Sequence, residues 1–119
     1  MQDKKQRLRG KADKLWYLKY VKEVCEVCGA SNCLQVHHFY YKGSFSHLRY
    51  NSDNGITLCK GCHFVLHHQD PKKIEDIIRK NRGGLWETRL KKEAYNRPTS
   101  SFLTVKYYED KIKELEGTL

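Results

Sequence analysis

The chain lacks the segments that mark membrane and secreted proteins. No apolar run approaches the roughly 20 residues that a helix needs to cross a bilayer, and the lysine-rich start has no apolar segment of a signal peptide. Internal repeats are also absent, which favours a single domain for 119 residues. We therefore expect a cytoplasmic, intracellular protein without a membrane partner.

Acidic residues are scarce, with 14 Asp and Glu against 23 Lys and Arg, so the formal net charge is +9. The excess is uneven: +6 in residues 1–22, −1 in 23–71 and +4 in 72–119. Basic flanks around a nearly neutral centre favour a polyanionic partner. A hydrophobic content of 39% indicates a globular chain and not a disordered one.

Hydrophobic spacing and helix-end signals predict a mixed α+β protein. Residues rich in β-formers predict short strands at 34–39 and 55–58, separated by a loop. Helical spacing predicts helices at 4–22, 60–68, 71–82, 85–96 and from about 104 to 115. Trp16 and Trp86 are expected in the core.

The cysteines fall into two pairs of equal spacing, Cys25-x2-Cys28 and Cys59-x2-Cys62, which are thirty residues apart. In a chain expected to stay reduced, this spacing favours a metal over disulfides. Four thiolates form the closed tetrahedral ligand set of a structural zinc ion. Four unrelated buried cysteines are the alternative. Cys33 has no partner at ligand spacing and is assigned to no site.

The histidines predict a second site. Adjacent strand residues point to opposite faces, so His37 or His38 alone could be a packed core residue. A zinc ion that joins the two cysteine pairs would bring the strand of His37 and His38 near the helix that carries His63. One of the two strand histidines can then share an ion with His63, while the second strand histidine acts as a base. His67 lies one turn after His63, and His68 is expected in solvent.

The order Cys-x2-Cys, His-His, Asn, Cys-x2-Cys-His closely resembles the HNH endonucleases over about residues 25–68, above all in Asn54-Gly55-Ile56-Thr57-Leu58-Cys59-Lys60-Gly61-Cys62-His63. The resemblance implies a small, treble-clef-like ββα-metal core at residues 25–69, in which two antiparallel strands and a helix surround one divalent ion. A basic helical arm at 1–24 and a helical extension at 70–119 would flank it in one compact domain.

The same resemblance implies roles for single residues. His37 and His63 would bind the catalytic ion, and His67 matches a further ligand that some members use and others replace. His38 would be the general base that activates water, and Asn54 would brace the loop that orients it. We expect Mg²⁺ or Mn²⁺ at this site, although histidine ligands also admit Ni²⁺ or Zn²⁺.

The implied function is metal-dependent hydrolysis of phosphodiester bonds in duplex DNA, which is bound mainly through its phosphates. Cations for this role are plentiful in the basic arm, at Lys4, Lys5, Arg7, Arg9 and Lys11. The loop between the strands carries residues that either touch the DNA groove or pack within their own loop: Tyr40, Tyr41, Phe45 and Arg49.

Two alternative functions belong to other classes. A zinc-stabilised nucleic-acid-binding module would keep this fold without cleaving, but it needs neither a base nor an open ion. A domain that docks its C-terminal helices on a larger nucleoprotein or phage assembly is compatible with a nuclease core.

Overall fold

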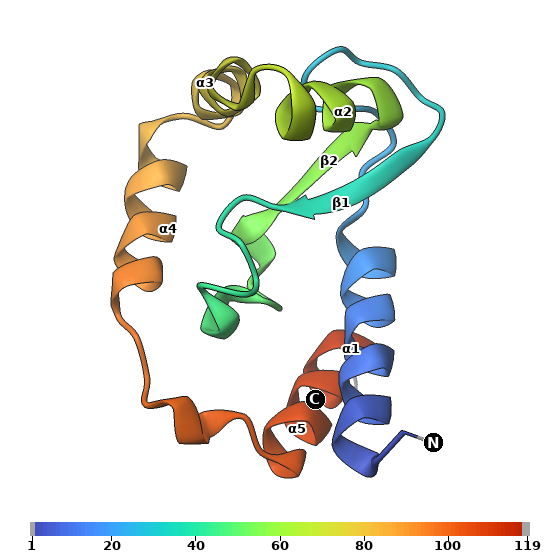
Figure 1. Ribbon diagram of the computed structural model, residues 1–119, viewed down its shortest axis with the longest axis vertical. Coiled ribbons are helices and arrows are strands. Elements are labelled where there is room, and N and C mark those ends of the chain that lie inside the picture. The colour runs from blue at the N-terminus through green and yellow to red at the C-terminus, as the bar shows by residue number, and fades with distance from the viewer. Residues whose placement is uncertain (1, 118–119) are drawn as a thin grey trace.

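The computed structural model of the protein describes residues 2–117. Met1 and residues 118–119, the ends of the predicted arm and extension, lie outside the described residues. Figure 1 shows the elements in chain order: α1 (Lys4–Tyr20), β1 (Leu34–His38), β2 (Gly55–Cys59), α2 (Lys60–His68), α3 (Pro71–Arg82), α4 (Gly84–Tyr95) and α5 (Val105–Glu116). The predicted α+β composition is confirmed. None of the described helices is both long and apolar enough to span a bilayer.

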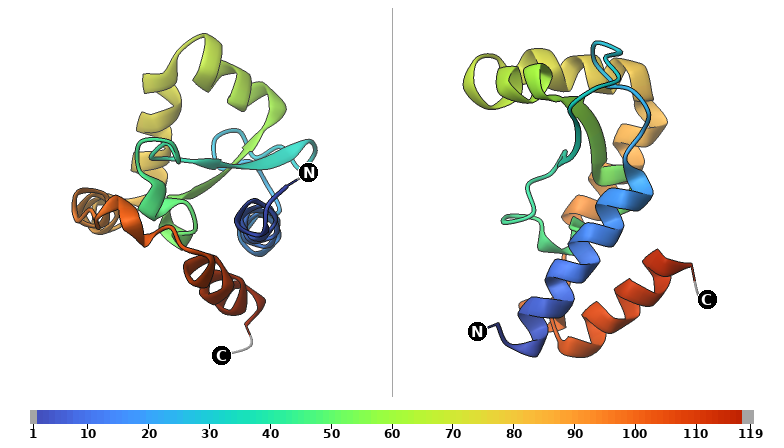
Figure 2. Two further views of the ribbon diagram at one scale, coloured as in Figure 1. Left: turned by 60° about the horizontal axis from the view of Figure 1, so that its bottom comes forward. Right: turned by 90° about the vertical axis from the view of Figure 1, so that its right-hand side faces the viewer.

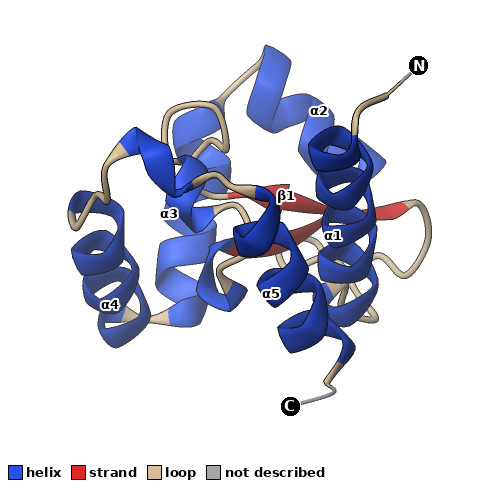
Figure 3. Cartoon of the chain, turned by 90° about the horizontal axis from the view of Figure 1, so that it is seen from below, coloured by secondary structure: helices blue, strands red, loops and turns tan. Residues whose placement is uncertain are grey.

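The two strands form an antiparallel pair, with Leu34 opposite Cys59 and His38 opposite Gly55. Every residue of β2 is buried, and β1 is half-buried along its length. Because α2 begins directly after β2, it lies beside the two paired strands. Figure 3 shows the short strands surrounded by helices.

The helix α1 is packed against the body of the protein. Asp3 caps it: its carboxylate accepts a hydrogen bond from the Gln6 N–H at 2.8 Å, and the Gln6 side chain accepts one from the Asp3 N–H at 3.1 Å. Its buried face carries Ala12 and Trp16. This face packs with α5, which lies beside α1 in both views of Figure 2. The helix ends at Tyr20, two residues earlier than predicted.

The ends of α3 follow the sequence signals. The Asp70 side chain accepts a hydrogen bond from the Lys73 N–H at 3.1 Å, and Pro71 occupies the first helical position. Gly83 ends the helix with a positive φ of 91°, a conformation that favours glycine. The same residue precedes α4, which ends before Pro98 as predicted.

Two hydrophobic clusters lie on either side of β1. One joins β2 to the helices α2, α3 and α4, and it includes Trp86. The other joins α1 to α5 and includes Trp16. Both tryptophans are buried, at 5% and 3% exposure, so their predicted core placement is confirmed. Consecutive residues of β1 therefore face different surroundings, which separates the environments of His37 and His38.

Candidate metal centres and the pocket between them

The four paired cysteines form one group. The Sγ atoms of Cys25, Cys28, Cys59 and Cys62 all lie within 4.8 Å of one another, and Cys28 Sγ is 3.5 Å from Cys59 Sγ. A tetrahedral zinc with Zn–S bonds of about 2.3 Å would hold its sulfur atoms about 3.8 Å apart. The donor set therefore fits a closed structural metal site, as the spacing predicts. Cys33 is exposed and lies outside the group.

The first cysteine pair sits on a tight turn. Gly29 has a φ of 78°, and its N–H donates to the Cys25 carbonyl at 3.0 Å. The Cys25 N–H donates to the Ala30 carbonyl at 2.8 Å, which closes the turn. Burial opposes ionisation of Cys25, but hydrogen bonds from neighbouring backbone groups lower the pKa of its thiol to about 7. The turn therefore favours the thiolate form of Cys25, whereas the pKa of Cys28 is raised, because a hydrogen bond with the Ala30 backbone is outweighed by hydrogen bonding with Cys59 and Cys25.

Glu26 connects this turn to β2 and to α3. Its carboxylate accepts two hydrogen bonds from the Arg82 guanidinium, both at 2.8 Å, and one from the Thr57 N–H at 2.7 Å. Arg82 also donates to the Gly55 carbonyl at 2.7 Å. Both charged side chains are largely buried, at 9% and 13% exposure. No sequence pattern signals this pair, because its members lie 56 residues apart.

The second group consists of three imidazoles. Ring nitrogens of His37, His63 and His67 lie within 4.8 Å of one another. His37 comes from β1, whereas the other two lie one turn apart on α2, with ring centroids 4.3 Å apart. Burial lowers the pKa of His37 to about 4, and the charges of His67 and His63 act in the same direction. His37 is therefore neutral at pH 7, the form that binds metal.

His67 and its neighbour His68 lie in different surroundings. His67 joins the imidazole group, and its ring centroid lies 5.0 Å from that of His37. The His68 ring instead lies 4.8 Å from the exposed ring of Phe64. Three nitrogen donors without a carboxylate form an open set that fits a divalent transition-metal ion better than Mg²⁺, which prefers oxygen ligands.

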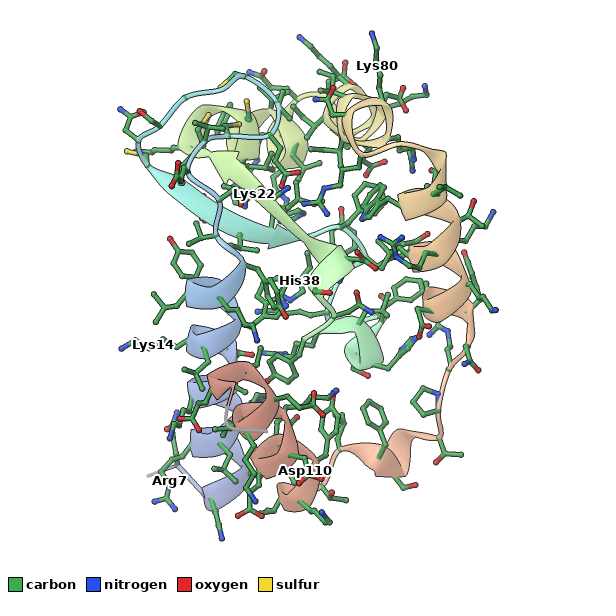
Figure 4. All side chains as sticks on the ribbon, turned by 180° about the vertical axis from the view of Figure 1, so that it is seen from behind. Arg7, Lys14, Lys22, His38, Lys80 and Asp110 are labelled. Atoms are coloured by element: carbon green, nitrogen blue, oxygen red, sulfur yellow. The ribbon has the colours of Figure 1, made fainter. Side chains whose placement is uncertain are left out.

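His38 points away from the imidazole group and packs under α1. Its Nε2 lies 3.0 Å from the Arg49 carbonyl oxygen. A carbonyl only accepts hydrogen bonds, which assigns the proton to Nε2 and leaves a lone pair on Nδ1. Figure 4 shows His38 in the interior beside α1. Burial lowers the pKa of His38 below its usual range, so the neutral imidazole is present at neutral pH.

Asn54 is fully buried and ties the two ends of the β1–β2 connection together. Its Oδ1 accepts a hydrogen bond from the Tyr40 N–H at 2.7 Å. Its Nδ2 donates to the Tyr40 carbonyl at 3.1 Å and to the Leu48 carbonyl at 3.2 Å. Leu48 precedes Arg49, whose carbonyl accepts the hydrogen bond from His38 Nε2. Asn54 thus holds the segment that fixes the His38 ring, and it is not part of the imidazole group.

Arg49 binds α1 through its side chain. Its guanidinium donates two hydrogen bonds to the Asp13 carboxylate, at 2.7 and 2.6 Å, and the Tyr50 hydroxyl donates a third at 2.9 Å. The Arg49 guanidinium therefore forms an ion pair within the protein. Of the other loop residues, Tyr40 packs against Phe45, with ring centroids 4.9 Å apart. Tyr40 and Phe45 therefore pack within the loop, whereas Arg49 binds α1.

A surface pocket of about 440 Å³ connects the two histidine environments. His37 and His67 of the imidazole group line it together with His38. Tyr41, which is 56% exposed, and Lys42 complete its rim from the β1–β2 connection. We call it the histidine pocket. Residues of both histidine environments therefore line one pocket.

The predicted phosphate-binding cations of α1 are all exposed: Lys4, Lys5, Arg7, Arg9 and Lys11. Lys11 lies 3.7 Å from Glu116 of α5, so this cation is partly neutralised. Arg7 and Lys14 extend outward from the helix in Figure 4. The helix therefore presents several positive charges to solvent.

Comparison of the chain with protein-family models, curated proteins and solved structures found no match. The function is therefore inferred from the chemistry of the site. The described residues combine a closed four-thiolate group, an open group of three imidazoles and a partly buried neutral histidine that shares a pocket with two of them.

Proposed function

We propose that the protein is a metal-dependent DNA endonuclease of the HNH type that hydrolyses phosphodiester bonds. The histidine pocket carries this proposal, because His38 lines it together with His37 and His67. β1, β2 and α2 follow one another in the ββα order that the family resemblance implies. The four-cysteine group would hold a structural zinc next to this core.

In this mechanism His38 is the general base. Its free Nδ1 takes a proton from water, the water oxygen forms a bond to phosphorus, and the bond from phosphorus to the 3′ oxygen breaks. The leaving 3′ oxygen takes a proton from solvent, which gives a 5′-phosphate and a 3′-hydroxyl. The Arg49 carbonyl bonded to Nε2 keeps the ring oriented and stabilises the imidazolium that forms.

His37, His63 and His67 would hold the catalytic ion. When bound, a divalent ion supplies Lewis-acid stabilisation for the negative charge that develops on the phosphate and on the leaving oxygen. Because no carboxylate belongs to this ligand set, the charge of a bound divalent ion would not be neutralised by its ligands and would suit an anionic substrate. The three nitrogen donors favour Mn²⁺, Ni²⁺ or Zn²⁺ over Mg²⁺ at this position.

DNA is the substrate that matches the charge of the surface. The net charge of +9 and the exposed cations of α1 favour a long polyanion over a small phosphate ester. Contacts from these side chains to phosphates would position the duplex without reading its sequence. The alternative of a non-cleaving nucleic-acid-binding module shares this charge but gives the histidine pocket no task.

The test is cleavage of supercoiled plasmid in Mg²⁺, Mn²⁺, Ni²⁺, Zn²⁺ or EDTA by the wild type, His38→Ala and His68→Ala. We expect metal-dependent cleavage that His38→Ala lowers by about 10²- to 10⁴-fold, whereas the control His68→Ala keeps it. Cleavage that survives His38→Ala would remove His38 as the base. Plasmid binding without cleavage in any of these metals would identify a binding module instead.

A further inference from the structure

Lys42 stands out among the residues that line the histidine pocket. It is the only lysine or arginine among the lining residues that the structure describes, and no aspartate or glutamate joins it there. Its side chain is exposed, and its ammonium makes no hydrogen bond or salt bridge with the described residues. The lining of the pocket therefore holds one cation and no carboxylate, although Lys42 lies near enough to Asp13, outside the lining, to help lower the pKa of that carboxyl.

The backbone around Lys42 is held from both sides. Asn54 binds the N–H and the carbonyl of Tyr40, at 2.7 and 3.1 Å. Two residues beyond Lys42, the Ser44 carbonyl accepts a hydrogen bond from Arg97 at 2.9 Å. The Cα atom of Lys42 is thereby fixed at the pocket rim, while its four-carbon side chain stays free to reach a ligand.

The positive charge of Lys42 reaches the proposed base. Burial is the main cause of the lowered pKa of His38, and the charges of Lys42 and Arg49 act in the same direction. The guanidinium of Arg49 is paired with Asp13, so Lys42 is the cation left available to a ligand. A phosphodiester in the pocket would lie between this ammonium and the imidazole group.

We propose that Lys42 is a further catalytic residue, whose ammonium contacts a non-bridging oxygen of the scissile phosphate in the histidine pocket. This inference rests on the proposed nuclease function. Lys42 keeps its proton throughout and stabilises the charge that builds on the phosphate when water attacks. Its cation comes from the β1–β2 connection, whereas the imidazole group comes from β1 and α2, so the phosphate would be held from two separate elements.

The proposal is tested with Lys42→Ala, Lys42→Arg and the control Lys14→Ala, which removes the same charge from the outer surface of α1 (Figure 4). Single-turnover cleavage of an end-labelled duplex is measured with each variant in the metal that supports the wild type. Binding of the same duplex without added divalent ion is measured by fluorescence anisotropy. Circular dichroism and zinc content verify that each variant is folded.

We expect Lys42→Ala to slow cleavage by about 10²-fold relative to Lys14→Ala, and Lys42→Arg to recover most of the rate. Without added divalent ion, binding should weaken about equally in the two alanine variants, because each loses one phosphate cation. A Lys42→Ala rate within about threefold of the control would overturn the role of Lys42 and leave the nuclease function standing. Absence of cleavage by the wild type in every metal would overturn both.

Discussion

The indole of Trp16 lies flat against the imidazole of His38, with ring centroids 4.3 Å apart and ring planes within 7°. Trp16 belongs to α1 and His38 to β1, so this stack joins the N-terminal helix to the proposed catalytic base. The Trp16 Nε1–H also donates to the Asn51 carbonyl at 3.3 Å. One face of the His38 ring is therefore shielded from solvent, which contributes to the burial that lowers its pKa.

Replacement of Trp16 should impair catalysis as well as folding. Trp16→Leu removes the stacked ring, and we expect a loss of about 3 kcal/mol in unfolding free energy together with slower cleavage by the folded fraction. Trp86→Leu is the matched control, because Trp86 is equally buried but has no ring contact with His38. The comparison uses single-turnover rates at a temperature where both variants are folded. Equal rates in the two variants would contradict a positioning role for Trp16.

Asn54 is expected to be the most sensitive polar residue of the β1–β2 connection. Asn54→Ala leaves the N–H and the carbonyl of Tyr40 without partners and removes one of the two hydrogen bonds to the Leu48 carbonyl, so we expect about 3 kcal/mol of destabilisation in urea denaturation. The control Asn51→Ala loses a single local bond to the Asp53 N–H and should cost about 1 kcal/mol. Similar losses in both variants would mean that the connection does not depend on Asn54.

His67 and His68 offer a direct test of the ion site. His67→Ala removes one of three nitrogen donors, so we expect Ni²⁺ or Mn²⁺ to bind at least about tenfold more weakly. His68→Ala should leave the affinity unchanged, because His68 lies outside the group. Isothermal titration of zinc-loaded protein measures both. An affinity that is unaltered in His67→Ala would reduce the ligand set to His37 and His63.

The four-cysteine group should carry zinc and hold the fold together. Cys59→Ser removes a ligand that also caps α2, and we expect zinc loss with more than about 3 kcal/mol of destabilisation. Cys33→Ser should keep both the zinc and the stability, since Cys33 is exposed and outside the group. Elemental analysis and thermal unfolding provide the readouts. A Cys59→Ser protein that is zinc-free and as stable as the wild type would contradict the assignment.

The Glu26–Arg82 pair should make stability depend on pH. Although burial raises it, the pKa of Glu26 is lowered overall, first by its hydrogen bond to Arg82. Its contribution is therefore present above the unfolded-state pKa of about 4.3 and is lost as the pH falls through the lower folded pKa. Glu26→Gln should cost about 3 kcal/mol at pH 7.

The matching measurement is urea denaturation of wild type and Glu26→Gln at pH 7 and below pH 4. Zinc release at low pH affects both proteins, so the informative quantity is the difference between them, which should shrink in acid. The control Asp76→Asn breaks an exposed ion pair with Lys72, and we expect no comparable pH-dependent difference in unfolding free energy. A difference that stays constant with pH would exclude the Glu26 charge as its cause.

Features encoded by neighbouring residues were predicted well. Asp70 and Pro71 at one end and Gly83 at the other predict α3 to the residue, because caps act within a single turn. The start of α5 after Thr104 lies where the helical spacing of Val105, Tyr108 and Ile112 predicts it. The predicted end of α1 at residue 22 lies two residues beyond the observed end at Tyr20, because Val21 adopts an extended backbone although no helix-breaking residue stands there.

The sequence by itself determined the two cysteine pairs, the helix ends and the histidines available as ligands, because spacing of a few residues fixes these features locally. The tertiary structure decided that His67 faces His37, that Trp16 covers His38, and that Glu26 meets Arg82. The residues of these three contacts are 30, 22 and 56 positions apart in the sequence, so the contacts depend on the path of the whole chain. Only packing of the helices around β1 brings them within reach of one another.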